Sequence, residues 1–170
     1  MGMPRKIKNF DVFQNGGDWR GQVAEVNLPK LSRKLEEWRG GGMNAAVDVD
    51  LGMEKLEAEL TFGGYMYDVL KEFGITKVDG VQLRFAGAAQ ADDTGAVDSV
   101  EVVMRGRYTE IDPGGHKSGD DTEFKVKASI VYYKLSVNGE VLIDIDVLSM
   151  IENVGGVDRL AEQRRAIGWA

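Results

Sequence analysis

The chain has 170 residues, which is long enough for one domain with its own core. Of its residues, 43% are hydrophobic and 29% are charged, and this composition excludes a disordered segment. The formal net charge of −7 argues against a domain that grips nucleic acid, because such a domain needs a basic surface to displace counterions. The absence of cysteine excludes disulfides and thiolate metal sites, and no apolar run approaches the roughly 20 residues of a membrane-spanning helix. We therefore expect a single soluble domain, residues 1–170, without stable membrane insertion.

Most of the chain alternates apolar and polar residues with a period of two, which predicts β-strands. In residues 47–51, for example, apolar residues alternate with Asp48 and Asp50. This pattern is typical of an antiparallel sheet with one packed face and one hydrated face. Strands are expected at residues 10–12, 23–26, 47–51, 56–60, 100–110 and 140–148. A turn at residues 14–19 is expected to join the first two strands, and Asn138-Gly139 predicts a tight hairpin turn.

The segment before residues 47–51 carries conflicting signals. Leu31, Leu35 and Trp38 recur at helical spacing, which leaves helix and strand both open for residues 31–39. The glycine run at residues 40–42 is followed by neither the lysine nor the Ser or Thr of a phosphate-binding loop. We therefore interpret the glycines as a loop that needs positive φ angles rather than as a nucleotide site.

Two other segments have helical periodicity. Residues 65–73 predict a short helix that ends at Gly74, and residues 158–167 predict a second helix with Asp158 as its N-cap and Gly168 after its end. The predicted fold is therefore mainly β (α+β), an antiparallel β-sandwich or barrel with one short flanking helix and a short C-terminal helix.

No group of residues matches a catalytic or metal-binding arrangement. The tripeptide Asp93-Thr94-Gly95 occurs once and has polar flanks, whereas an aspartic protease needs two buried copies. His116 is the only histidine, and its aspartate-rich loop fits no calcium-binding spacing. We predict no catalytic residue, no metal, no cofactor and no enzyme activity. The alternative from another class is a small β-barrel hydrolase or ligand-binding domain that uses the His116 loop.

Three stretches of the sequence resemble the major tail tube proteins of contractile-tailed bacteriophages, a family that includes the tube subunits of R-type bacteriocins. The stretches are "LPKLSRKLEEWRGGGMNAAVDVDLGM", "LRFAGAAQADDTGAVDSVEVVMRGRYTEIDPGG" and "GGVDRLAEQRRAIGWA". The likeness runs in order from Pro4 onward without large gaps, and the small departures lie in loops such as residues 112–121.

The resemblance implies a structural subunit that closes into rings of six, which stack head to tail into a hollow tube inside a contractile sheath. It implies contacts with further copies of the chain and with the tail sheath, baseplate and tail terminator proteins. It also implies a place in the virion tail, after assembly in the host bacterial cytoplasm. In a phage, DNA would pass through the lumen without specific binding. The alternative, an R-type bacteriocin, is a headless tail.

Under this resemblance, residues 31–39 become the first strand of a hairpin over about residues 31–60, and neighbouring copies complete each other's unpaired sheet edges. The inter-subunit hairpin loop would consist of Arg39, Gly40, Gly41, Gly42 and Met43. The lumen would be lined by the acids of two strands, with their apolar neighbours packed against the second sheet: Asp48, Asp50, Glu57 and Glu59. Because stacked subunits of charge −7 repel one another, five arginines are expected to meet acids on the next ring: Arg105, Arg107, Arg159, Arg164 and Arg165.

Overall fold

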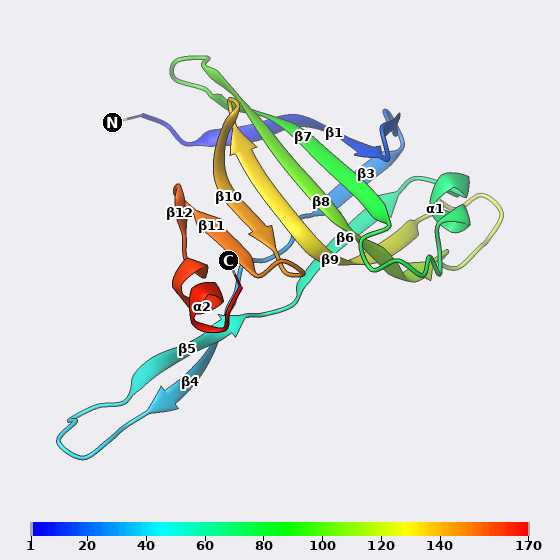
Figure 1. Ribbon diagram of the computed structural model, residues 1–170. Helices are drawn as coiled ribbons and strands as arrows, with labels where there is room; N and C mark the ends of the chain where they lie inside the picture. Colours follow the sequence, from blue (N-terminus) through cyan, green and yellow to red (C-terminus); the bar gives the residue numbers. More distant parts are fainter. Residues whose placement is uncertain (1, 170) are drawn as a thin grey trace.

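The computed structural model describes residues 2–169, which form a curled antiparallel sheet with a hairpin projecting from it (Figure 1). The strands in this range are β1 (Arg5–Gln14), β2 (Gly17–Asp18), β3 (Val23–Asn27), β4 (Arg33–Trp38), β5 (Val47–Met53), β6 (Leu56–Phe62), β7 (Val81–Ala91), β8 (Val97–Asp112), β9 (Phe124–Val137), β10 (Glu140–Asp146), β11 (Ile151–Val154) and β12 (Val157–Asp158). The helices are α1 (Tyr67–Lys71) and α2 (Ala161–Ala166). The prediction of a mainly β fold with two short helices is confirmed.

The sheet divides at β9. One edge of this strand pairs with β8, while the other pairs with β6 over residues 124–130 and with β10 over residues 132–137. From β9 the sheet continues through β8, β7 and β1 to β2, through β10 and β11 to β12, and through β6 to β3. Within the described residues, the outer edge of β3 and most of the outer edge of β1 therefore pair with no other strand.

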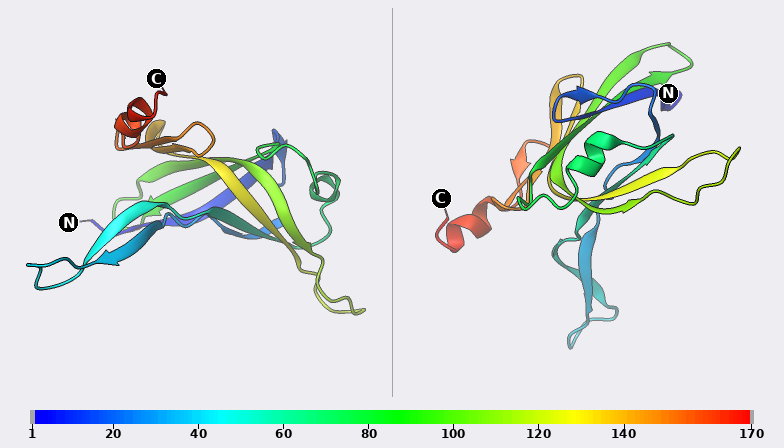
Figure 2. Two further views of the ribbon diagram at one scale, coloured as in Figure 1. Left: turned by 60° about the horizontal axis from the view of Figure 1, so that its bottom comes forward. Right: turned by 90° about the vertical axis from the view of Figure 1, so that its right-hand side faces the viewer.

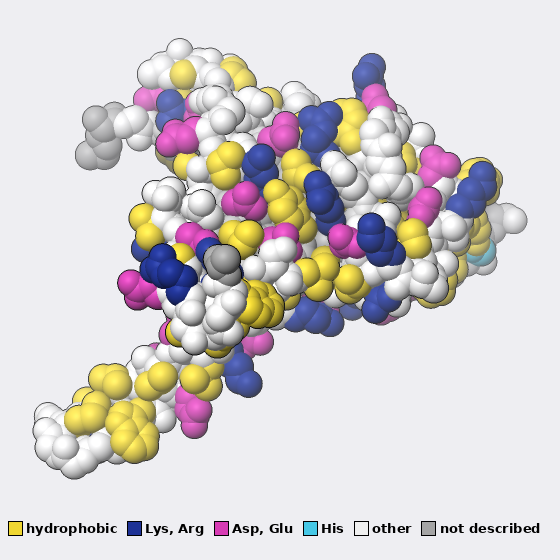
Figure 3. Space-filling model, viewed as in Figure 1, with side chains coloured by type: hydrophobic (Ala, Val, Ile, Leu, Met, Phe, Trp, Pro, Cys, Tyr) yellow, Lys and Arg dark blue, Asp and Glu magenta, His cyan; other side chains and the backbone are white. Residues whose placement is uncertain are grey.

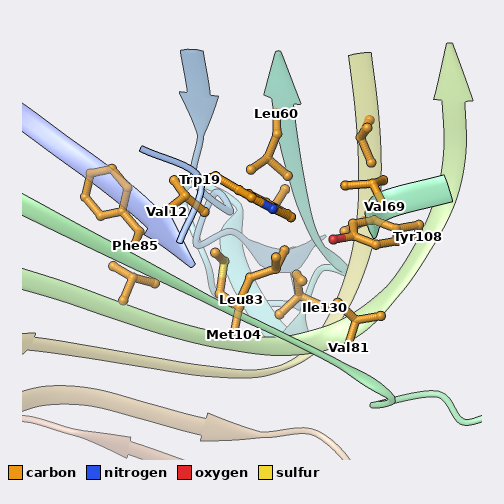
Figure 4. Close-up of a cluster of buried hydrophobic side chains, with 14 of the residues drawn as sticks. Val12, Trp19, Leu60, Val69, Val81, Leu83, Phe85, Met104, Tyr108 and Ile130 are labelled. Carbon is orange, nitrogen blue, oxygen red and sulfur yellow. The ribbon is translucent and has the colours of Figure 1, made fainter. Parts of the chain in front are cut away.

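The core lies on the concave side of the curled sheet. Side chains from β1, β6, β7 and β8 converge there, as Figure 4 shows for Val12, Leu60, Leu83 and Met104. Each buried aliphatic side chain contributes roughly 1.5–3 kcal/mol, so the alternation in the sequence decides which face of each strand turns inward. Helix α1 lies at one end of the curled sheet, where Val69 is fully buried (Figure 2).

A bulge between β8 and β9 lets the long β8 strand bend. The register shifts between Arg105 and Gly106 on β8, opposite Tyr132 and Ile130 on β9. A Cβ atom on Gly106 would lie 1.9 Å from the backbone carbonyl oxygen of Ser129, much closer than two such atoms can approach. Only glycine therefore fits at this position without a shift of the backbone.

Three local predictions had different outcomes. The turn at Asn138-Gly139 joins β9 to β10 with φ angles of 50° and 83°, as predicted. The turn at Asn15 joins β1 to the short β2, and the strand predicted at residues 23–26 is present as β3, which pairs with β6 and not with β1. Asp158 is not the N-cap of α2, because Leu160 holds that position. The Asp158 carboxylate instead accepts a hydrogen bond from the Leu160 backbone N–H and forms an ion pair with Arg164.

Candidate assembly surfaces

Strands β4 and β5 form a two-stranded sheet that pairs with no other strand of residues 2–169. It projects from the curled sheet in every view (Figures 1 and 2). Residues 33–38 are thus a strand and not a helix. The hairpin is shorter than the predicted span of about 31–60, because residues 56–62 form β6 and pair with β3 and β9 in the main sheet.

The projecting hairpin has one mainly apolar face and one mainly acidic face, with Glu36 opposite Val49 on the first and Leu35 opposite Asp50 on the second. Trp38 lies opposite Val47 in the register, and Glu37 lies opposite Asp48. On the first face, Trp38, Val47, Val49 and Leu51 form what we call the apolar stripe, with 41–61% of each residue exposed. Figure 3 shows hydrophobic side chains gathered along this hairpin. The apolar neighbours of Asp48 and Asp50 therefore do not pack against a second sheet of the same chain, which corrects that part of the prediction.

An isolated two-stranded hairpin is only marginally stable in water, and three or more strands or a packed face are normally required. Contiguous exposed apolar surface of this kind usually marks an interaction site. We therefore expect the apolar stripe to be buried against another protein chain.

The predicted hairpin loop lies at the far end of β4 and β5. Gly42 has a φ angle of 84°, which favours glycine, while Gly40 and Gly41 have no positive φ. The backbone N–H of Met43 donates to the carbonyl oxygen of Gly40 at 3.2 Å, and the Arg39 side chain donates to the carbonyl oxygen of Met43. These contacts close the loop on itself, which agrees with a turn rather than a phosphate cradle.

The four acids predicted to line a lumen lie on two different elements. Asp48 and Asp50 lie on β5, and the Arg33 guanidinium donates to Asp50 at 2.8 Å, which holds the pKa of the Asp50 carboxyl below its ordinary value. Glu57 and Glu59 lie on the exposed face of β6. Lysines accompany these two acids, because Lys55 pairs with Glu57 at 2.7 Å and Lys127 lies 3.7 Å from Glu59.

The lysine beside Glu57 favours the charged form of this carboxyl. The hydrogen bond from Lys55 lowers the pKa of the Glu57 carboxyl. Lys127 on β9 lies between two acids, because it is also 3.9 Å from Glu110 on β8. The outer face of β6, β9 and β8 is therefore a row of alternating charges and is less acidic than the sequence of β6 alone indicates.

The free edges of β1 and β3 flank a groove of about 800 Å³. Ile7 and Phe10 of β1 line it from one side, and Val26 of β3 and the following Leu28 line it from the other. The register of β1 against β7 shifts between Ile7 and Asn9, so a bulge on the paired side bends the strand that carries this edge. Unpaired edges beside exposed apolar side chains can accept a strand from another chain.

The five arginines predicted to join rings lie in two separate parts of the fold. On β8, Arg105 stacks over the ring of Tyr132, and Arg107 donates to the carbonyl oxygen of Thr76. Around α2, Arg164 pairs with Asp158 at 2.5 Å, so its charge is already neutralised within the chain. The hydrogen bond from Arg164 lowers the pKa of the Asp158 carboxyl. In residues 2–169, Arg159 and Arg165 have no side-chain ion pair.

The His116 loop brings together aromatic groups rather than catalytic groups. The Tyr65 hydroxyl lies 2.5 Å from Nε2 of His116, and the Tyr65 ring also packs beside Phe124. No group of three or more His, Cys, Asp or Glu residues in the described part of the chain is arranged to hold a metal ion. The two described helices are also too short to cross a bilayer.

One contact at the base of the hairpin was missed by the sequence analysis. Arg33 at the start of β4 donates to the carboxylate of Glu152 on β11, 119 positions further along the chain. The sequence signal was a single acid directly after Ile151 and two positions before Val154, which marks a carboxylate that needs a partner in a packed strand.

Comparisons with known proteins show which family the chain is similar to. Residues 4–168 match the family model described as phage tail tube protein FII. The chain is 50% identical to the tail tube protein of Escherichia phage P2 over 171 residues, which cover 99% of both chains. It is 40% identical to the major tail tube protein of Serratia phage KSP20 over 153 residues, 89% of this chain and 88% of the relative.

Solved structures with low sequence identity share the fold. A chain of the PVC sheath–tube complex from an extracellular contractile injection system superposes with a TM-score of 0.58 at 11% identity, covering 77% of this chain and 90% of the other. The tube-terminating cap of the anti-feeding prophage gives a TM-score of 0.59 at 12% identity, covering 80% and 93%. The family match over nearly the whole chain and the two phage relatives establish that this protein belongs to the phage tail tube protein FII family.

Proposed function

We propose that this tail tube subunit closes into rings of six, and that the rings stack into the hollow inner tube of a contractile phage tail. The observation that carries the proposal is the projecting hairpin, because its apolar stripe is exposed and has no partner strand within residues 2–169. The free edges of β1 and β3 support lateral contacts, since neighbouring copies can complete each other's hydrogen-bond ladders. Head-to-tail contacts between rings are heterologous and do not close, so they generate an open filament.

The partners of the tube follow from its relatives. One chain of the same fold was solved in a sheath–tube complex and another as a tube-terminating cap. These structures support contacts of the present subunit with a tail sheath and a terminator, and we add a baseplate as the third partner. The subunit is assembled in the host bacterial cytoplasm and functions in the virion tail as a structural element without catalysis. Its two curated relatives belong to phages, which favours a phage tail over a headless bacteriocin tail.

Electron microscopy of the purified full-length protein in negative stain tests this function. We expect rings with six-fold symmetry and stacks of such rings with a central channel. A protein that stays monomeric at every concentration and salt condition, with and without a sheath partner, would overturn the proposal.

We further propose that the acidic face of the hairpin and the exposed face of β6 line the lumen, with DNA passing along them without specific binding. Asp48 contributes negative charge to this lining, whereas Asp50 is paired with Arg33, Glu57 with Lys55 and Glu59 with Lys127. A lining that repels phosphates cannot hold DNA, while a basic lining would bind it through many phosphate contacts. Arg159 and Arg165 remain the candidates for contacts with acids on the next ring.

Changing Asp48, Glu57 and Glu59 together to lysine is expected to leave tubes intact and to slow the release of DNA into host cells several-fold, because each subunit then offers phosphate contacts. The measurement is the time course of DNA entry in a phage that carries the variant subunit. The matched control replaces the same acids by asparagine and glutamine, which removes the negative charge without adding a positive one. Unchanged entry kinetics in the lysine variant would count against the lumen assignment.

A further inference from the structure

The hairpin formed by β4 and β5 is connected to the rest of the fold through one polar side-chain contact. Within residues 2–169, the pair of Arg33 and Glu152 is the only hydrogen bond or ion pair that joins residues 31–54 to the body. The other hydrogen bonds of this segment are internal, such as the backbone hydrogen bond from Glu54 to Ser32 that closes the base of the hairpin, while Met53 packs against the main core. Apart from the chain connections and the packing of Met53, the direction of the hairpin thus depends on this pair.

The position of Glu152 is fixed by the main sheet. Its backbone pairs with Ile145 of β10, and its carbonyl oxygen accepts from the N–H of Arg159. Only 8% of its side-chain surface is exposed, against 38% for Arg33. A buried carboxylate is costly unless it is paired and hydrogen-bonded, so the fold at β11 strongly favours the hairpin position in which Arg33 reaches it.

Hollow space lies on both sides of the pair. Two grooves of about 780 and 440 Å³ are each lined by Arg33, Glu152, Met53 and Leu160. The apolar side chains at the hairpin base therefore leave hollow space beside those around α2, although Met53 packs against the main core. Because packing is incomplete here, it specifies the angle between the hairpin and the body less tightly than a close-packed interface would.

Arg33 also reaches the opposite strand of its own hairpin. It donates through Nε to Asp50 on β5 at 2.8 Å while another nitrogen donates to Glu152. The planar guanidinium presents its donors in a fixed fork, so one side chain ties both strands of the hairpin to the body with defined geometry.

We infer that the Arg33–Glu152 pair is a positioning contact that sets the angle of the hairpin and thereby presents the apolar stripe to the next subunit. The inference rests on the proposed tube assembly and assigns the hairpin direction to two residues of this chain. A buried ion pair adds little net stability compared with apolar packing, and its best-attested role is to specify one geometry. The pair is therefore expected to control assembly more than folding.

The direct test measures the hairpin angle. Because the chain has no cysteine, spin labels can be placed at Asn44→Cys on the hairpin and Ser99→Cys on β8, both of them exposed positions. We expect a narrow distance distribution in the parent protein and a broad one after Arg33→Gln or Glu152→Gln. The double change Arg33→Glu with Glu152→Arg restores opposite charges and is expected to narrow the distribution again. Equal distributions in the parent and both single variants would overturn the inference.

The assembly test uses the same variants without labels. Tube growth is expected to slow at least about tenfold in Arg33→Gln and Glu152→Gln, because a lost hydrogen bond between charged groups corresponds to roughly that factor or more. The matched control is Arg84→Gln, which removes an arginine of the same 38% side-chain exposure that pairs with Glu101 in the body. That control should leave the rate of tube growth unchanged and, in the labelled protein, the label distances as well. If the parent protein forms no tubes, the proposed function fails; if the parent and the single variants grow equally fast, only the positioning contact fails.

Discussion

Replacing Gly106 by alanine is expected to destabilise the subunit by about 3 kcal/mol, because an added methyl group in a tightly packed position forces the backbone apart. The new Cβ would lie 1.9 Å from the carbonyl oxygen of Ser129, and a backbone atom cannot move away as a flexible side chain can. For a chain of this length, such a loss lowers the melting temperature by about 6–12 °C. Thermal unfolding followed by circular dichroism measures it directly.

Gly64→Ala is the matched control for this experiment. A Cβ at Gly64 meets no atom within 4 Å, and the backbone there has no positive φ. A glycine-to-alanine change at such a position stabilises a protein by about 0.4–1 kcal/mol, since it reduces the entropy of the unfolded chain. If Gly106→Ala and Gly64→Ala melted at the same temperature, the bulge between β8 and β9 would be able to relax, and our account of it would be wrong.

Replacing Val49 by aspartate is expected to abolish tube formation at protein concentrations where the parent protein assembles. Val49 is in the centre of the apolar stripe and is 41% exposed in the single chain. Burying a charge without a partner against a neighbouring subunit costs far more than the roughly 1.5–3 kcal/mol that a buried valine contributes. We therefore expect the concentration required for assembly to rise at least about 100-fold, which corresponds to a loss of about 2.7 kcal/mol or more.

Sedimentation and negative-stain microscopy measure this change, and the melting temperature of the unassembled subunit shows whether the fold survives. The melting temperature should stay within about 2 °C of the parent value, because surface substitutions usually change stability by no more than about 0.5 kcal/mol. Asp48→Asn, on the opposite face of the same strand, is the control and should assemble normally. Normal tubes from Val49→Asp would show that the apolar stripe is not an assembly surface.

Local patterns in the sequence predicted the strands well, for a clear physical reason. In β6, alternate residues are buried and exposed, and the pleat turns every second side chain to the core, so the prediction needed no knowledge of the partner strand. The same argument failed for β5, where the alternation is equally regular but Val47, Val49 and Leu51 face outward in the single chain. A period of two shows that one face needs covering, but not which chain covers it.

Long-range pairing could not be predicted from such patterns. The division of β9 between β6 and β10 depends on segments about 70 residues before it and directly after it. The Arg33–Glu152 contact joins residues 119 positions apart, and neither residue belongs to a recognisable motif. For residues 31–39 the helical spacing and the glycine run disagreed, and tertiary context decided in favour of the strand.

The bulge on the outer strand β1 affects how readily the subunit aggregates when it is present at high concentration. A long, flat, exposed strand border is a template for cross-β fibres, and proteins guard against this with irregularities and lysines. Here the irregularity falls between Ile7 and Asn9, at Lys8, which pairs with Asp92. A regular strand from an unrelated or misfolded chain cannot match this border over its length. Under the proposed assembly, the subunit can therefore accumulate before its tail is built, and that border stays available for another copy of the subunit with the same bulge.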